Sequence, residues 1–167
     1  MSSQNAAYKR FCLLIACLLV GWCLAFPAAG TAAEDAPKRS KGQMVYVPIY
    51  SHVYAGDREK PVYLAATLSI RNVDLKGSIT LTRADYYDSD GRLIKNYIQA
   101  PVTLKAMSST RFVISESDKI GGSGANFLVQ WSASQSVNPP LMESVMISTR
   151  SALGISFTSR GRVIQPE

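Results

Sequence analysis

Apolar and polar side chains alternate over short stretches of this chain, and no long segment after residue 42 keeps a helical period. The clearest alternation covers residues 62–70. It predicts a half-buried strand, because successive side chains of a strand point to opposite faces. Residues 126–133 repeat the pattern, with an inward face formed by Phe127, Val129, Trp131 and Ala133. Weaker strands are predicted over residues 44–54, 79–87, 93–98, 110–115, 141–149 and 155–158.

Eight short strands separated by Gly, Pro, Asp and Asn predict an all-β fold. We expect a single-domain antiparallel β-sandwich of immunoglobulin-like type over residues 44–167, with Trp131 in a core that has no cysteine pair. The apolar positions of residues 79–87 change from odd to even residue numbers between Leu81 and Ala84, which predicts a bulge. Pro48 cannot donate a ladder hydrogen bond, so the first strand is expected to be kinked or to lie at a sheet edge.

The first 32 residues are expected to be a secretory signal peptide. Lys9 and Arg10 precede the uncharged residues 11–26, and a proline and small residues follow, which is the order of such signals. Cleavage near Ala32/Ala33 would leave a flexible leading segment, residues 33–43, before the domain. We therefore expect an exported protein that is periplasmic or secreted.

Two alternatives concern the same segment. Retention as an uncleaved membrane anchor is less favoured, because sixteen apolar residues fall short of the ~20 that span a bilayer. Lipidation at Cys17 is suggested by the Leu-Ile-Ala that precedes it, although this motif comes early in the apolar run. All three cysteines lie in residues 11–26, so the mature domain would hold neither a disulfide nor a thiolate metal site.

Composition and charge narrow the class of protein. With 47% hydrophobic and 18% charged residues, the chain is typical of a globular domain and unlike disordered, fibrous or multispan membrane proteins. Removal of Lys9 and Arg10 would lower the formal net charge from +6 to +4. The basic residues are scattered except for Lys38, Arg39 and Lys41, so peripheral association with anionic membranes is an open alternative. No nucleic-acid motif is present, and no nucleic-acid partner is expected.

One predicted strand carries an aromatic row. Its alternation places Tyr46, Tyr50, His52 and Tyr54 on one face and aliphatic residues on the other. Tyrosines can simply cover a sheet surface or form part of a second layer. They are also typical of recognition surfaces, because they offer a large contact area with a hydrogen-bonding tip. On an edge strand such a row would suit binding of a partner by strand addition.

Two loops contain residues that could bind ions. Asp88-Ser89-Asp90-Gly91 resembles the start of a calcium loop, but Tyr86 and Tyr97 stand where its first and last carboxylate ligands would be. A hairpin turn is favoured, and Asp85, Asp88 and Asp90 are only weak metal candidates. The glycine-rich residues 121–124 could bind an anion through backbone N–H groups, and the candidate residues are Gly122, Ser123, Asn126, Arg150 and Arg160.

Catalysis is less favoured than binding. A hydrolase would need Ser123 with His52 as base and Asp57 or Asp118 as orienting group, and no nucleophile elbow surrounds that serine. With one histidine and no cysteine in the mature chain, a catalytic zinc site is disfavoured. We expect no cofactor and no catalytic residue.

Several sequence blocks together resemble a bacterial family of exported proteins, known as domain of unknown function 3124. These blocks are VYVPIYSHVY, LSIRN, DYYDSDGRL, GGSGANFLVQW, NPPLMESVMI and GISFTSRGR, and the similarity covers about residues 45–164. The resemblance implies an exported single-domain protein and no particular activity, ligand or catalytic residue. The expected function is a non-catalytic binding or accessory domain of the cell envelope, whose partner is an envelope protein or a small ligand. A periplasmic protein that binds a small molecule, anion or cation is the alternative.

Overall fold

The computed structural model describes residues 38–148 and 154–166, and within these residues the chain is all-β. No helix among the described residues is long and apolar enough to cross a membrane. The predicted signal peptide, residues 1–32, lies outside them. The strands are β1 (Ser40–Pro48), β2 (His52–Ala55), β3 (Lys60–Tyr63), β4 (Ala65–Arg71), β5 (Ile79–Tyr87), β6 (Leu93–Asn96), β7 (Val102–Leu104), β8 (Ser109–Ile114), β9 (Asn126–Val137), β10 (Leu141–Ser148), β11 (Ile155–Arg160) and β12 (Arg162–Pro166).

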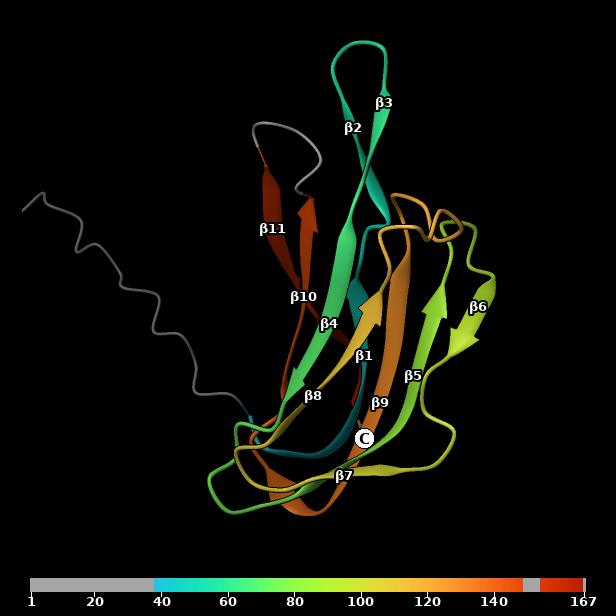
Figure 1. The fold of residues 1–167 in the computed structure, drawn as a ribbon. Coiled ribbons are helices and arrows are strands. Elements are labelled where there is room, and N and C mark those ends of the chain that lie inside the picture. The colour runs from blue at the N-terminus through green and yellow to red at the C-terminus, as the bar shows by residue number, and fades with distance from the viewer. Residues whose placement is uncertain (1–37, 149–153, 167) are drawn as a thin grey trace, which may run out of the picture. The chain divides into compact units, whose positions relative to one another are not determined.

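The strands form two main sheets and a separate hairpin, and every pairing is antiparallel (Figure 1). One sheet has the order β12-β1-β9-β5-β6, with β7 also paired to β5. The other has the order β11-β10-β4-β8. Strands β2 and β3 pair only with each other among the described residues. Neither main sheet closes on itself, so both keep edge strands.

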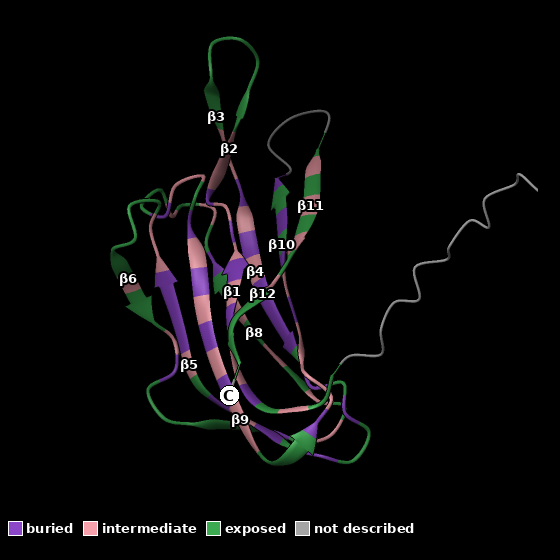
Figure 2. Ribbon diagram, turned by 180° about the vertical axis from the view of Figure 1, so that it is seen from behind, coloured by how far each residue is buried: buried purple, intermediate pink, exposed green. Residues whose placement is uncertain are grey.

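A single apolar core lies between the two main sheets (Figure 2). Burial alternates along β9, where Phe127, Val129 and Trp131 have no exposed surface. Leu64 and the inward residues of β4 face them from the second sheet, as the alternation over residues 62–70 predicts. The predicted bulge is also present, because the register between β5 and β9 shifts between Leu81 and Arg83. The extra residue at this point turns the side chain of Ala84 toward the core, where it is buried.

The first predicted strand differs from the structure. Strand β1 begins at Ser40, so residues 40–43 of the expected flexible segment are paired with β9. Strand β1 ends at Pro48, and the remainder of the predicted strand becomes β2. The predicted edge position is wrong, because β1 lies between β9 and β12. A terminal Pro48 is compatible with this central place, since its missing N–H falls where the ladder stops.

The sequence pattern did not indicate β7 and β12. Every residue of β12 is exposed and β7 has three residues, so neither shows a buried face that alternation could indicate. Strand β12 follows β11 through Gly161, where the chain passes from one sheet to the other. The Gly161 amide donates to the carbonyl of Met142 at 2.9 Å. A Cβ atom at this glycine would lie 2.8 Å from Val45 Cγ1, so the corner requires glycine.

Candidate recognition site at the hairpin end

Three segments that are distant in sequence meet at one end of the sheets: the β2–β3 hairpin, the turn at residues 88–91 and the loop at residues 115–125 (Figure 1). Backbone bonds join them. The Ser51 amide donates to the Gly122 carbonyl at 3.1 Å, and the Ser89 amide donates to the Gly121 carbonyl at 3.0 Å. The Leu64 amide donates to the Ser51 carbonyl at 3.0 Å, which fixes the base of the hairpin. We call this region the hairpin end.

Two serine hydroxyls hold the glycine-rich loop. Ser51 Oγ accepts from the Gly122 amide at 2.9 Å and donates to the Gly122 carbonyl at 3.2 Å. Ser89 Oγ accepts from the Gly124 amide at 2.9 Å and donates to the Gly121 carbonyl at 3.1 Å. The backbone N–H groups of Gly122 and Gly124 are therefore bound by the protein's own hydroxyls. Through these hydrogen bonds the loop connects the hairpin to the β5–β6 turn.

The hairpin carries an aromatic face. His52 contacts the rings of Tyr54 and Tyr63 edge-on, with centroids 5.2 and 5.9 Å away. Nε2 of His52 lies 3.2 Å from the Tyr54 hydroxyl oxygen. Nζ of Lys119, from the loop, lies 5.0 Å from the centre of the Tyr63 ring, within cation–π range. We call His52, Tyr54, Tyr63 and Lys119 the hairpin cluster.

The pairing register explains why these rings share one face. His52 is opposite Tyr63 and Tyr54 is opposite Pro61, while Val53 is opposite Val62 on the other face. Val53 packs against the core. The aromatic face is turned away from it, and Tyr54 is 56% exposed. Tyr63 and Lys119 were not among the sequence candidates, although the alternation over residues 62–70 places Tyr63 on the outward face.

The predicted aromatic row is broken in the structure. Only His52 and Tyr54 stay together. Tyr46 pairs with Leu128 and Arg162 within the six-stranded sheet. Tyr50 packs edge-on against Phe157 of β11, with 5.5 Å between ring centroids. Burial still alternates from Val47 to His52, so the side chains keep the predicted alternation. The row is divided because β1 ends at Pro48 in the six-stranded sheet, whereas β2 belongs to the separate hairpin.

Among the described residues, the remaining anion candidates lie on different elements. Asn126 begins β9, opposite Pro48 and Tyr87. Arg160 ends β11 opposite Glu143, and Arg150 lies outside the described residues. Ser123 makes no hydrogen bond to His52, whose Nδ1 instead lies 3.3 Å from Ser51 Oγ. The Ser51 hydroxyl is buried and bound to Gly122, which is the position of a structural serine.

The acidic residues serve the fold locally. The predicted hairpin turn is present: the Gly91 amide donates to the Asp88 carbonyl at 3.1 Å, and Gly91 has φ of 78°. The Asp88 carboxylate accepts from the amides of Asp90 and Arg92 at 2.9 and 2.8 Å. Asp85 is instead joined to Arg83. Across residues 38–148 and 154–166, no three His, Cys, Asp or Glu side chains form a group that could hold a metal ion.

A groove of about 450 Å³ adjoins the hairpin cluster and is lined by Lys95, Tyr97, Ser115, Ser117, Asp118 and Lys119, among others. Lys95 Nζ lies 4.4 Å from the centre of the Tyr97 ring. Burial raises the pKa of Tyr97 above its ordinary value, and the Asp118 carboxylate adds to this effect. Both effects disfavour the phenolate, so the groove presents a neutral phenol beside the side chains of Lys95 and Lys119.

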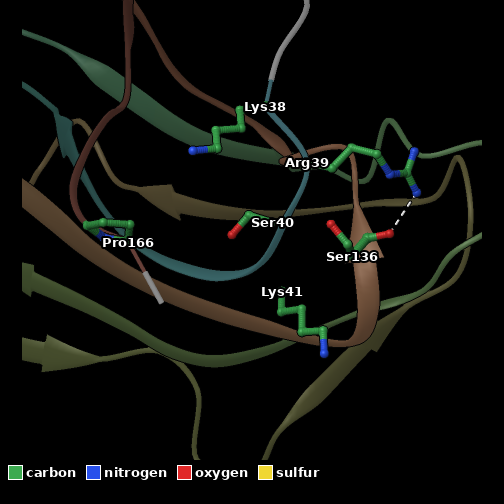
Figure 3. A pocket seen from close by; sticks show the side chains of 6 residues that line it. All are labelled: Lys38, Arg39, Ser40, Lys41, Ser136 and Pro166. Carbon is green, nitrogen blue, oxygen red and sulfur yellow. Dashed lines mark hydrogen bonds between the residues drawn. The ribbon is translucent and has the colours of Figure 1, made fainter.

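A second pocket, of about 530 Å³, lies where the described chain begins (Figure 3). It is lined by Lys38, Arg39, Ser40, Lys41, Ser136 and Pro166. Arg39 donates to the Ser136 carbonyl at 2.7 Å. The charged ends of the three basic residues point in different directions in Figure 3. They therefore do not converge on one small anion.

These features define an all-β domain of antiparallel sheets with a projecting aromatic hairpin. The chain belongs to a family described as protein of unknown function (DUF3124), whose model matches residues 42–164. No curated protein matches the chain. Among solved structures, the crystal structure of Thermotoga maritima 1070 is similar with a TM-score of 0.45 and 11% identity, over 77% of this chain and 97% of that one. A similarity this low carries no conclusion about function.

Proposed function

We propose that this protein is an exported, non-catalytic binding or accessory domain of the cell envelope, and that it holds a partner protein at the hairpin cluster. The observation that carries the proposal is the β2–β3 hairpin. It is paired to neither main sheet and it extends beyond them (Figure 1). On its aromatic face Tyr54 is exposed and His52 and Tyr63 are half-buried. Exposed aromatic side chains with polar tips are typical of interaction surfaces.

The hairpin is rigid enough at its base to act as a binding element. An isolated two-stranded hairpin is only marginally stable in water. Here the Ser51–Gly122 bonds and the packing of Val53 hold its base against the domain. Beyond the base, Tyr54 and the charged residues 57–60 are exposed. A fixed base with an exposed tip lowers the entropy that binding would cost.

The hairpin also offers backbone groups to a partner. Among the described residues, each of its strands pairs only with the other, so each has a free edge. An extended segment of a partner could add to such an edge through main-chain hydrogen bonds. The neighbouring aromatic face would then contact the side chains of that segment. This supports an extended segment of an envelope protein as the partner, in line with the export signal expected from the sequence.

The surroundings of His52 support binding over catalysis. Its two ring nitrogens lie near the hydroxyls of Ser51 and Tyr54. Ser51 is already bonded to the glycine loop, and Tyr54 is an exposed contact residue. In the usual nucleophile–base arrangement, a carboxylate orients the histidine that acts as the base. In this protein hydroxyl groups, and not a carboxylate, lie beside the two ring nitrogens of His52.

We also propose that the domain is a variant immunoglobulin-like sandwich. In immunoglobulin domains, sheet ABED faces sheet CFG. The β4–β8 and β5–β9 pairs correspond to the B–E and C–F pairs. The outer strands are exchanged, however, because β1 pairs with the F-like β9 and β10 pairs with the B-like β4. The shared central pairs support the kinship, and the exchanged outer strands are the departure from it.

In vivo photo-crosslinking tests the proposed function. A photoreactive phenylalanine analogue at position 54 is expected to give one discrete crosslinked protein in living cells, identifiable by mass spectrometry. Tyr63→Ser should remove this product and Tyr63→Phe should retain it, because the ring remains. The same analogue at position 46, within the six-stranded sheet, is the matched control and should not give it. If position 54 gives no product while the protein stays folded, the hairpin is not the binding element.

A small anionic ligand is the second candidate function, supported by the groove with Lys95 and Lys119. Two ammonium groups beside the Ser115 and Ser117 hydroxyls, which lie 2.8 Å apart, could bind a carboxylate or phosphate. Calorimetric titration with inorganic phosphate should then release heat, and a Lys95→Gln, Lys119→Gln variant should not. Absence of heat with the wild-type protein would exclude phosphate at this groove.

A further inference from the structure

Two loops meet at the end of the domain opposite the hairpin. Strand β4 starts beside the hairpin and leads into residues 72–77, and residues 105–108 lead into β8. The Asn72 side chain joins these loops, because Nδ2 donates to the carbonyls of Gly77 at 2.8 Å and Lys105 at 2.9 Å. The Met107 amide donates to the Asp74 carbonyl at 3.3 Å. We call this region, residues 38–41, 71–77, 104–109 and 134–141, the basic end.

Each loop exposes a large apolar side chain next to a lysine. Leu75 is 74% exposed and precedes Lys76, and Met107 is 66% exposed and lies two residues after Lys105. These are among the most exposed large apolar side chains of the described residues. Single exposed apolar residues are common on protein surfaces. Elements that bind at a lipid interface combine apolar side chains with Lys and Arg, and these two joined loops present both kinds of residue.

The backbone at Met107 argues that the exposed side chain has a role outside folding. Met107 has φ of 60°, in the left-handed region that a side chain with a Cβ adopts at a cost of about 1–2 kcal/mol. Glycine or asparagine would satisfy this backbone better. The side chain recovers little of that cost, because most of its surface faces solvent. Strained positions of this kind concentrate at functional sites.

The charge of this end is strongly one-sided. It contains Lys38, Arg39, Lys41, Arg71, Lys76 and Lys105, and its one acidic residue is Asp74. Asp74 is buried and lies 3.2 Å from Arg39, so it contributes little negative surface. The basic side chains are exposed and those of residues 38, 39 and 41 point apart (Figure 3). Such an arrangement suits many phosphates spread over a plane better than one small anion.

We propose that the basic end docks on an anionic lipid bilayer, with Leu75 and Met107 entering the interface and the lysines and arginines facing lipid phosphates. Polybasic surfaces gain affinity for anionic lipid from each Lys or Arg near the surface, and apolar side chains add burial to that attraction. The hairpin then faces away from the membrane.

The two apolar side chains are the reason to choose a bilayer over a soluble polyanion. A polyanion would need only the cations, whereas a bilayer also takes up Leu75 and Met107. This difference can be measured, because polar replacement at 107 removes the apolar contact without changing charge. Asparagine tolerates the left-handed backbone, so Met107→Asn should be at least as stable as the wild type.

Vesicle co-sedimentation tests the proposal with the protein in the form that its own cells produce. Binding to vesicles with 30% phosphatidylglycerol should be at least tenfold tighter than binding to pure phosphatidylcholine vesicles, and should fall as salt rises. Lys76→Gln with Lys105→Gln should weaken it about thirtyfold. Met107→Asn should weaken it severalfold with an unchanged or higher melting temperature. Lys60→Gln with Arg92→Gln, at the hairpin end, is the charge-matched control and should bind like the wild type.

Three outcomes would overturn the proposal. Equal binding to neutral and anionic vesicles would mean that the basic residues do not face the lipid. Equal losses in the Lys76/Lys105 and Lys60/Arg92 variants would mean that net charge acts without a particular surface. Full binding by Met107→Asn would mean that Met107 does not enter the interface, and full binding by a Leu75→Asn, Met107→Asn variant would mean that the surface fits a soluble polyanion instead. None of these results depends on the hairpin, so the proposed function stands or falls separately.

Discussion

Gly121 packs against Tyr86 so closely that a Cβ atom at position 121 would overlap the tyrosine hydroxyl and lie 2.8 Å from Cζ. The Tyr86 ring is buried and stacks on Phe127 with 5.3 Å between centroids. Burial raises the pKa of Tyr86 far above its ordinary value, and the nearby Asp118 raises it further. The loop that supports the hairpin therefore rests on a neutral, enclosed phenol.

Gly121→Ala is expected to destabilise the protein by more than about 2 kcal/mol, because neither the ring nor the backbone can move aside without disturbing the core. Chemical denaturation measures this. Tyr86→Phe removes the overlapped oxygen and should recover part of the loss in the double variant, since the two effects are coupled. A Gly121→Ala protein as stable as the wild type would contradict the close packing.

Acid should weaken the fold through Asp74. Backbone N–H groups of Asn138, Gly77 and Lys76 bond its carboxylate and, with Arg39, hold its pKa at about 2, below the ordinary 3.8. A lowered pKa in the folded state stabilises the fold above pH 3.8, and this contribution is lost as the pH falls from about 4 to about 2. Asp74→Asn should be less stable than the wild type at pH 7 and should lose less on acidification.

Urea unfolding between pH 7 and pH 2 measures the Asp74 effect. Asp57→Asn is the matched control, because Asp57 is exposed at the hairpin tip. This substitution removes the same formal charge as Asp74→Asn. Its stability profile should follow that of the wild type. Parallel profiles for Asp74→Asn and the wild type would show that this carboxylate does not govern the acid response.

Ser51→Ala should loosen the glycine loop. The substitution removes the 2.9 Å acceptor of the half-buried Gly122 amide, and a typical intramolecular hydrogen bond contributes about 0.5–1.5 kcal/mol. Hydrogen exchange at residues 121–124 should accelerate before global unfolding. Ser117→Ala, in the same loop region, is the control and should leave that exchange unchanged. Unaltered exchange in Ser51→Ala would mean that the Ser89 hydroxyl and the backbone hydrogen bonds fix the loop without the Ser51 hydroxyl.

Calcium should not stabilise the domain through Asp88. Its carboxylate is occupied by the amides of Asp90 and Arg92, and Asp85 is held by Arg83. Millimolar calcium is therefore expected to leave the melting temperature unchanged. Asp88→Asn should be nearly neutral because asparagine makes the same turn bonds, whereas Asp88→Ala should cost roughly 1 kcal/mol. A rise in melting temperature with calcium that Asp88→Asn abolishes would establish a metal site.

Local pattern predicts the strands well where one face is buried. The inward faces of β4 and β9 and the bulge near Leu81 follow from alternation, since a one-residue slip would expose the whole apolar face. The pattern fails at Pro48, which reads as an edge signal although it ends a central strand. It also cannot indicate β12, whose residues are all exposed and whose place depends on pairing with β1.

The candidate site was only partly predictable for a similar reason. His52 and Tyr54 were recognisable because they lie two residues apart on one strand face. Tyr63 and Lys119 join them through the hairpin register and a loop more than fifty residues further along the chain. Nothing within a short window of sequence indicates such neighbours. Tyr50, predicted on the same strand face, packs on Phe157 of β11 instead of joining the hairpin cluster.

The sequence by itself determined the all-β class, the buried faces and the family, because period-two alternation and extended blocks of residues are properties of the chain read locally. Only the tertiary structure decided which strands are central, which aromatic residues form the hairpin cluster and that Leu75, Met107 and the basic residues share one end. These depend on pairing between distant segments, where hydrogen-bond register and burial select one arrangement among many that the local pattern allows.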